Sequence, residues 1–300
     1  MNVLSLFDGI SCGQLAAHRA GLEVGNYYAS EIDEYAMAIT EKNYPATVFI
    51  GDVYKVKPSE LPPLDLLLGG SPCQSFSVAG KKEGFLSENG RLFFEYVRIL
   101  RESKPRWFLY ENVICSSAVQ AVISKALGVK PLMLDASFVS AQNRKRLYWT
   151  NIPTEELGDL GITLGDVLID GCGVELDLEG TLENYSFKKN YVQWDKSGKG
   201  YNSQDQRAFY SDNKHGTVPK SRTITKCKVF YKDVNKKSYR LKCLGLNEIE
   251  VLQTLPYNYT LLQDGFSLNK STEAIGNGWC VNVIAHILKG IKKKTIGFGG

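Results

Sequence analysis

The sequence predicts an α/β fold, in which a doubly wound and mostly parallel sheet is joined to a smaller domain that is irregular or β-rich. Short apolar runs such as Leu66–Leu68 and Trp107–Tyr110 are bounded by turn residues, as in strands that are buried on both faces of a parallel sheet. Segments with helical apolar periodicity alternate with these runs along the first half of the chain. This alternation is lost between Ile152 and about Val234, which predicts the second domain.

The individual elements follow from the same patterns in chain order. Strands are expected over residues 3–7, 27–30, 48–50, 66–68, 107–110, 133–134 and 147–149. Helices are expected over residues 14–20, 33–43, 92–102, 116–127, 240–255 and 283–289. Gly21 and Pro45 end the first two helices. Helices between successive strands are the crossovers that a parallel sheet requires.

Composition excludes several classes of protein. The 300 residues with 43% hydrophobic content are ample for a core. Seven scattered cysteines without a CxxC pair, and only three histidines, argue against a disulfide framework, so we expect no metal site and a reducing compartment. No signal peptide and no run of about 18 apolar residues is visible. We expect a cytoplasmic protein, or a nuclear one in a eukaryotic source, that is monomeric and has no membrane partner.

The first strand, turn and helix have the layout of a Rossmann-like, nucleotide-binding βαβ unit. Gly9 and Gly13 lie in the turn, and Glu31 ends the next strand at the distance where an acidic residue receives ribose hydroxyls. The glycine spacing departs from GxGxxG, so a nucleoside ligand without a pyrophosphate, such as S-adenosylmethionine, fits better. Asp52 follows the third strand and could accept an adenine amino group. Packing glycines and a turn cap are the alternative interpretations of this turn and of Asp52.

A cysteine follows the fourth predicted strand on a shaped loop. Gly69 and Gly70 let the backbone turn, and Pro72 fixes its own φ just before Cys73. A loop at the carboxyl end of such a strand is where open α/β sheets bind ligands. Cys73 is therefore a candidate nucleophile, and a buried, inert thiol is the alternative. The polar stretch from Ser75 to Arg91 could cover the site.

Two further motifs carry polar groups at strand ends. Glu111-Asn112-Val113 follows an aromatic strand, and Gln142-Asn143-Arg144-Lys145-Arg146 leads into an apolar one. A carboxylate and a basic cluster at such places can orient a substrate, although a solvated edge is the alternative for the basic cluster.

Charge is distributed unevenly along the second half of the chain. Residues 151–183 contain nine acidic side chains and no Lys or Arg, whereas residues 184–239 contain thirteen Lys or Arg against four Asp or Glu. A basic face of this kind suggests a polyanionic partner, because phosphate neutralisation dominates affinity for nucleic acids. A solvated, lysine-rich surface is the alternative.

In order and spacing, these motifs resemble those of the cytosine-5 DNA methyltransferases over nearly the whole chain except about residues 151–221. Phe7-Asp8-Gly9-Ile10-Ser11-Cys12-Gly13, Ser71-Pro72-Cys73-Gln74 and Trp279-Cys280-Val281 resemble the phage, bacterial and de novo vertebrate branches. The resemblance implies four catalytic residues: Cys73, Glu111, Arg144 and Arg146. It also implies that S-adenosylmethionine is held by Phe7, Asp8, Gly9, Ile10, Gly13, Glu31, Ile32, Asp52, Val53, Pro72 and Asn277.

The resemblance further implies how the chain is divided and what it binds. Residues 1–151 would form the catalytic domain, residues 152–239 the target-recognition domain, and residues 240–300 a return to the catalytic domain. The partner would be double-stranded DNA, from which the target cytosine is flipped out. Ser11-Cys12 and Gly278-Trp279 depart from the common family pattern, which leaves open the detail of the methionine end of the cofactor pocket.

Three alternatives compete with this interpretation. A tRNA cytosine-5 methyltransferase would use the same scaffold, but the Gly-Ser-Pro-Cys form and the size of the recognition region favour the DNA branch. A catalytically silent homologue would have no physical need for Cys73, Glu111, Arg144 and Arg146 together. An exocyclic-amine methyltransferase would carry an Asp/Asn-Pro-Pro-aromatic loop in place of Ser71-Pro72-Cys73-Gln74.

Overall fold

The computed structural model describes residues 1–72, 88–176, 185–194, 207–218, 227–233 and 238–296. The chain divides into two compact units. The first unit comprises residues 1–135, 145–157 and 281–300, and the second comprises residues 136–144 and 158–280. Of the recognition domain expected over residues 152–239, residues 158–239 belong to the second unit, which also includes residues 136–144 and 240–280.

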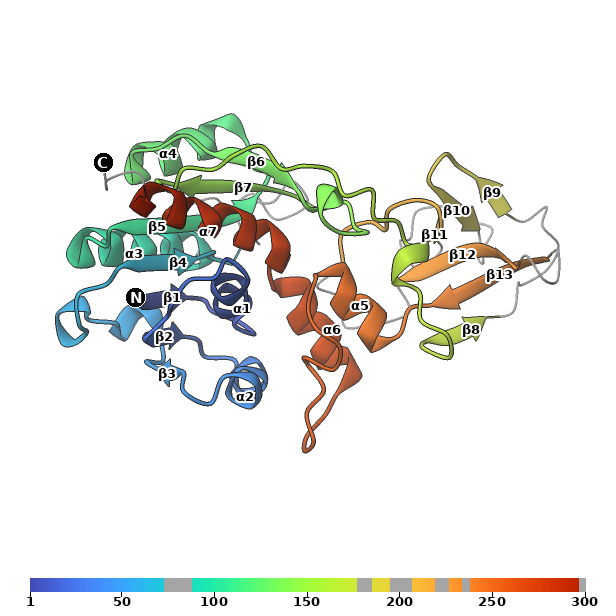
Figure 1. The fold of residues 1–300 in the computed structure, drawn as a ribbon, viewed down its shortest axis with the longest axis horizontal. Coiled ribbons are helices and arrows are strands. Elements are labelled where there is room, and N and C mark those ends of the chain that lie inside the picture. Colours follow the sequence, from blue (N-terminus) through green and yellow to red (C-terminus); the bar gives the residue numbers. More distant parts are fainter. Residues whose placement is uncertain (73–87, 177–184, 195–206, 219–226, 234–237, 297–300) are drawn as a thin grey trace. The chain divides into compact units, whose positions relative to one another are not determined.

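The first unit is built on a seven-stranded sheet with the order β3-β2-β1-β4-β5-β7-β6 (Figure 1). Its strands are β1 (Asn2–Leu6), β2 (Asn26–Ser30), β3 (Val48–Phe49), β4 (Leu66–Gly69), β5 (Trp107–Val113), β6 (Leu132–Asp135) and β7 (Lys145–Thr150). The five strands β3, β2, β1, β4 and β5 run parallel, and β7 is antiparallel to both of its neighbours. The predicted doubly wound, mostly parallel sheet is confirmed.

Among the described residues, four helices lie in the connections between these strands, and a fifth, α7, follows the second unit in the chain. They are α1 (Cys12–Arg19), α2 (Glu34–Asn43), α3 (Glu88–Ser103), α4 (Ser117–Leu127) and α7 (Val281–Ile296), with short 3₁₀ turns η1 (Val53–Lys55) and η2 (Pro58–Glu60). Side chains of α3 and α4 pack with those of β1, β4, β5 and β7 in one apolar core. Figure 1 shows α7 beside α1, where Arg19 donates a hydrogen bond of 2.9 Å to the Asn282 side chain.

The second unit contains a six-stranded sheet with the order β8-β13-β12-β11-β10-β9. Its elements are β8 (Val174–Leu176), β9 (Tyr185–Phe187), β10 (Tyr191–Trp194), β11 (Arg207–Tyr210), β12 (Lys228–Asp233), β13 (Ser238–Cys243), α5 (Leu246–Leu252), α6 (Leu268–Asn277), η5 (Ala136–Phe138) and η6 (Gly165–Val167). Val192, Ala208, Phe230 and Leu241 form a small core on one face of this sheet. The predicted β-rich region is thus confirmed.

The sequence-based elements differ from the structure at three places. Residues 240–243, expected to be helical, belong to β13, because they pair with β12 on one side and in part with β8 on the other. Helix α6 was not predicted. The helix expected over residues 92–102 begins earlier, at Glu88, within the polar stretch 75–91, and residues 75–87 of that stretch lie outside the described part of the chain.

Candidate active site

The predicted site residues of the first unit gather at the carboxyl edge of the parallel strands. The chain leaves β1 towards β2 and β3 on one side, and returns to β4 and β5 on the other. The order therefore reverses between β1 and β4, which is the place where open α/β sheets bind ligands. The turn after β1 and the loop at Ser71 and Pro72 after β4 both start from this point.

The turn after β1 has an unusual backbone conformation. Phe7, Gly9 and Ser11 have φ angles of 56°, 59° and 55°, in the left-handed region that side chains other than glycine rarely adopt. Steric crowding does not require glycine at residue 9, since a Cβ there would meet nothing within 4 Å. The Gly9 N–H donates a hydrogen bond of 2.7 Å to Glu31 Oε2. A bare glycine backbone therefore lies directly against a carboxylate.

Glu31 is held in place by the backbone around it. Its Oε1 accepts hydrogen bonds from the N–H groups of Ile32 and Asp33, at 2.8 and 2.9 Å. The next side chain, Ile32, is 74% exposed although it is apolar. A fixed carboxylate beside an open apolar side chain suits a nucleoside, because its ribose offers hydroxyl donors and its base offers a flat apolar face.

Asp8 points into the protein rather than towards solvent. Its Oδ1 accepts a hydrogen bond of 2.7 Å from the Tyr27 hydroxyl, and its Oδ2 accepts one from the Ser11 hydroxyl. Desolvation raises the pKa of Asp8 to about 6, although these two hydrogen bonds oppose the shift. Asp8 therefore braces the turn from within.

The other residues predicted to bind the cofactor have mixed environments. Asp52 caps η1 by accepting from the Tyr54 N–H at 3.0 Å, so the turn-cap interpretation holds for one of its oxygens. Ile10, Gly13 and Val53 are buried and can shape the pocket through packing. Phe7 and Pro72 are partly exposed in the first unit, whereas Asn277 is exposed at the end of α6 in the second.

Glu111 and Arg146 form an ion pair on one face of the β5–β7 ladder. The Arg146 Nε lies 3.1 Å from Glu111 Oε1, and both side chains are largely buried. Val113 pairs with Arg146 and Glu111 with Tyr148, so the two charged residues are diagonal neighbours on one face. Strand β5 reaches three residues beyond the Gly69–Tyr110 pair that ends its ladder with β4. Glu111 is therefore part of the strand, and not of a loop that follows it.

Tyr110 connects the loop after β4 to the strand that carries Glu111. Its hydroxyl lies 2.6 Å from the Ser71 hydroxyl and accepts a hydrogen bond of 2.9 Å from the Asn112 side-chain amide. Sequence analysis missed Tyr110 and Ser71 as members of the site. Their connection spans 39 residues of sequence, so only the register between β4 and β5 reveals it.

Arg144 has different surroundings from Arg146, since it belongs to the second unit. Its Nη2 donates to the carbonyl oxygens of Gly276 and Gly278, at 3.2 and 2.9 Å. These carbonyls lie at the C-terminal end of α6, where a cation complements the helix dipole. Gln253 also donates to the Gly278 carbonyl, at 3.1 Å. The geometry makes Arg144 a support for the turn around Asn277.

A segment after β11 braces the residues that precede Arg144. The Lys214 ammonium donates to the carbonyls of Ser137 and Ser140, at 2.6 and 3.4 Å. His215 is bonded through its backbone to Ala141 and Asn143, both at 2.7 Å. Burial lowers the pKa of His215 to about 4, so its ring is neutral at physiological pH. Neither residue was singled out from the sequence, where both look like part of a basic surface.

The predicted nucleophile, Cys73, lies outside the described residues. Five of the six described cysteines are buried, and Cys172 is partly exposed. Desolvation raises the pKa of Cys115 to about 11 and that of Cys227 to about 12, so these two thiols are poor nucleophiles.

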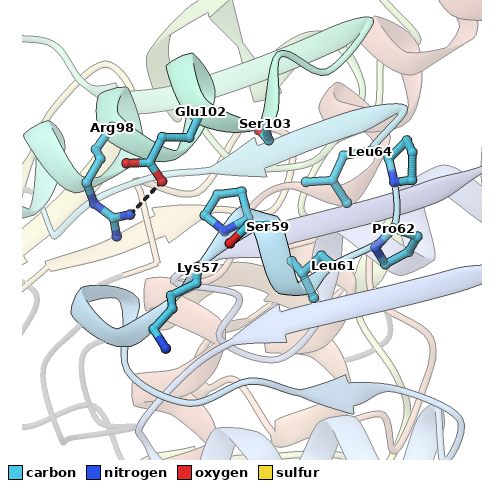
Figure 2. A pocket seen from close by; sticks show the side chains of 10 residues that line it. Lys57, Ser59, Leu61, Pro62, Leu64, Arg98, Glu102 and Ser103 are labelled. Carbon is cyan, nitrogen blue, oxygen red and sulfur yellow. Dashed lines mark hydrogen bonds and ion pairs between the residues drawn. The ribbon is translucent and has the colours of Figure 1, made fainter.

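A hollow of about 720 Å³ lies elsewhere on the first unit (Figure 2). It is lined by residues 57–59 and 61–64 before β4 and by the C-terminal part of α3, and so belongs to the amino edge of the parallel strands. Its charges are paired, as in Arg98–Glu102 at 3.1 Å and Lys57–Glu60 at 2.8 Å. The hollow is therefore separate from the candidate active site.

The described residues contain neither a metal-binding cluster nor a membrane-spanning helix. No cluster of three or more His, Cys, Asp or Glu side chains there could hold a metal ion. No helix in that part of the chain has the length and apolar character needed to cross a membrane.

Comparison with known sequences points to one family. The family model for C-5 cytosine-specific DNA methylase matches residues 1–158. The orphan methyltransferase M.SPRI of Bacillus phage SPR is 34% identical over 233 residues, which cover 66% of this chain and 53% of that protein. The type II methyltransferase M.FnuDI of Fusobacterium nucleatum is 29% identical over 98% of this chain and 94% of its own. The chain thus spans about half of the phage relative.

Solved structures share the fold at low identity. The Entamoeba histolytica methyltransferase EhMeth matches with a TM-score of 0.72 and 17% identity, over 98% of both chains. The Dnmt2 methyltransferase of S. pombe matches with a TM-score of 0.68 and 15% identity, over 99% of this chain and 100% of that one. The chain therefore shares its fold with these proteins.

Proposed function

Because the chain belongs to the C-5 cytosine-specific DNA methylases, we propose that it transfers a methyl group from S-adenosylmethionine to carbon 5 of a cytosine in duplex DNA. The observation that carries the proposal is the Glu111–Arg146 pair at the carboxyl edge of the sheet. A carboxyl group and a guanidinium held side by side can address both polar edges of a cytosine ring, its amino group with nitrogen 3 and its carbonyl oxygen.

The cofactor pocket is assigned to the turn after β1 and to Glu31. S-adenosylmethionine, when bound, supplies an electrophilic methyl group. The Glu31 carboxylate would receive the ribose hydroxyls, Ile32 would contact the adenine, and Asp52 would accept the adenine amino group through the oxygen that does not cap η1. The left-handed turn at Gly9 leaves the backbone open for a close approach.

Cys73 is assigned as the nucleophile, because carbon 5 of cytosine is too weakly nucleophilic to take a methyl group unaided. The Cys73 sulfur gives up its proton and bonds to carbon 6, which makes carbon 5 enamine-like. Carbon 5 would then take the methyl group as its bond to the donor sulfur breaks, and the donor would leave as the thioether S-adenosylhomocysteine. Loss of the carbon 5 proton to solvent and departure of the Cys73 thiolate restore the aromatic ring.

Glu111 and Arg146 stabilise the ring while it is attacked. Glu111 holds the amino group and nitrogen 3 and shares a proton with nitrogen 3 as negative charge builds there. Arg146 donates to the carbonyl oxygen. Since the two side chains bind each other in the structure described, the incoming base must take over part of their hydrogen bonding. Arg144 is assigned a supporting role within the second unit, where its guanidinium holds the turn around Asn277.

The basic stretch 184–239 is proposed to bind duplex DNA and to read its sequence. Within it, Lys188 and Lys189 are exposed in the turn between β9 and β10. Exposed lysines of this kind can neutralise phosphates. The target base is flipped out of the duplex before chemistry, at a cost of a few kcal/mol of unstacking.

The test is transfer of labelled methyl from S-adenosylmethionine to double-stranded DNA and to tRNA in parallel, with bisulfite sequencing of the labelled product. Label in duplex DNA at cytosines of one recurring sequence is the expected result. Label only in tRNA would replace the substrate but keep the chemistry. Label in neither would overturn the proposed activity and favour a silent homologue.

A further inference from the structure

The Tyr110 hydroxyl is the centre of a buried hydrogen-bond network beneath the candidate active site. It lies 2.6 Å from Ser71 Oγ and 2.9 Å from Asn112 Nδ2. The orientation of the Asn112 amide is fixed, because its oxygen accepts the Val113 N–H at 2.8 Å. One tyrosine oxygen therefore ties the residue two positions before Cys73 to the residue immediately after Glu111.

The ring of Tyr110 is held rigidly on the core side of the sheet. Its centroid lies 4.9 Å from that of Tyr96, 5.3 Å from that of Phe93 and 5.9 Å from that of Trp149. Burial raises the pKa of Tyr110 well above its usual value, so the hydroxyl keeps its proton and remains both a donor and an acceptor. A neutral phenol fixed by three aromatic neighbours can set the position of whatever it binds.

The network reaches Glu111 through the backbone. Side chains alternate along a strand, so Tyr110 and Asn112 face one side of β5 while Glu111 faces the other, towards Arg146. The Tyr110 network thus pins the backbone on both sides of Glu111. The loop after β4 is pinned at Ser71 by the same oxygen.

We propose that Tyr110 is a positioning residue whose hydroxyl sets the Ser71-Pro72 loop against the segment of β5 that carries Glu111. This inference rests on the proposed function, in which the residue that follows Pro72 and the carboxyl group of Glu111 act on one cytosine. A displacement of about 1 Å between reacting groups can lower a rate about 100-fold. Loss of the Tyr110 hydroxyl is therefore expected to lower the rate of methyl transfer and to leave the affinity for the cofactor nearly unchanged.

The structure offers a matched control for this hydroxyl. The Tyr96 oxygen is also buried, and it has no hydrogen-bond partner among the described residues. Tyr110→Phe and Tyr96→Phe thus each remove one buried hydroxyl from neighbouring rings of the same core. Only the first substitution removes the hydrogen bond between β5 and the loop after β4.

The first experiment compares the two variants in single-turnover methyl transfer at saturating DNA and S-adenosylmethionine, together with the dissociation constant of the cofactor. Tyr110→Phe is expected to slow transfer about 10-fold or more, with the dissociation constant of S-adenosylmethionine changed less than about twofold. Tyr96→Phe should leave both within about twofold. Equal rates for Tyr110→Phe and the unmodified protein would overturn the inference. Ser71→Ala breaks the same bond from its other end and replaces Tyr110→Phe if that variant does not fold.

A second readout separates the inference from the proposed activity. The rate at which iodoacetamide alkylates Cys73, followed by peptide mass spectrometry from pH 6 to 10, needs neither DNA nor cofactor. Tyr110→Phe and Ser71→Ala should shift this pH profile, and Tyr96→Phe should not. An altered profile in a protein that fails to methylate any nucleic acid would refute the proposed activity and retain the link between Tyr110 and the loop. Profiles identical to that of the unmodified protein would refute the link.

Discussion

Glu111 is assigned two tasks in the proposed chemistry, since it both holds the cytosine ring and shares a proton with nitrogen 3. Its carboxylate is largely buried and paired with Arg146 at 3.1 Å, so it is oriented before any base arrives. Glu111→Gln keeps the shape but removes the group that shares a proton with the ring. We expect methyl transfer to slow by about 10²- to 10⁴-fold while cofactor affinity stays nearly constant. Single-turnover rates and equilibrium binding measure the two effects, and equal losses in both would contradict the assigned role.

Asp8 makes the stability of the first unit depend on pH. Its pKa rises from 3.8 to about 6, so the folded state binds a proton more tightly than the unfolded state does. This stabilisation is fully present below about pH 4 and is lost as the pH rises through 6, at a cost on the order of 3 kcal/mol. Asp8→Asn removes the titration. The difference in melting temperature, variant minus unmodified protein, should therefore increase between pH 4.5 and 7.5, and a constant difference would refute the assignment.

At the residue scale, sequence spacing could predict Glu31 but not Tyr110. Glu31 lies at a fixed distance from the glycine turn within one βαβ unit, and the structure confirms that the two touch. The Tyr110–Ser71 contact depends on which strands are neighbours and in what register, which no local pattern encodes. The same applies to Arg144, whose partners come from a helix more than 130 positions further along the chain.

At the scale of elements, apolar runs predict strands correctly where both faces of the strand are buried. β1, β4 and β5 read as continuous apolar segments because helices cover both of their faces. Arg240 and Lys242 alternate with Leu241 and Cys243, which is typical of a strand, and the expected helix over residues 240–255 is wrong there because it extends the helical pattern of α5 back over β13. Pairing with β12, rather than local propensity, decides that Arg240–Cys243 is a strand.

Helix α7 packs so closely on the segment after β7 that only glycine fits at residue 290. A Cβ on Gly290 would lie 1.8 Å from the Pro153 carbonyl oxygen, which is backbone and cannot turn away. Gly290→Ala should therefore destabilise the protein by about 3 kcal/mol or more. Gly158→Ala is the control, because a Cβ there meets nothing within 4 Å and is expected to change stability by less than about 1 kcal/mol. Urea unfolding compares them, and equal midpoints would contradict the packing.

At the scale of the whole molecule, the uneven charge should govern binding to DNA. If the basic stretch 184–239 neutralises about four phosphates, affinity for duplex of unrelated sequence should fall about 100-fold between 50 and 200 mM salt. Replacing both Lys188 and Lys189 with Gln should flatten the salt dependence, whereas Lys57→Gln should not, since Lys57 pairs with Glu60 at the amino edge of the other unit's sheet. A salt dependence unchanged by the double substitution would place the DNA surface elsewhere.

The most direct test of the account is tritium release from duplex DNA whose cytosines carry tritium at carbon 5. Addition at carbon 6 followed by methylation at carbon 5 must expel that hydrogen, so one tritium should be released for every methyl group transferred. Cys73→Ala should lose both signals together while still binding S-adenosylmethionine. Methyl transfer without tritium release would place the methyl group on another atom of the base and contradict the central claim.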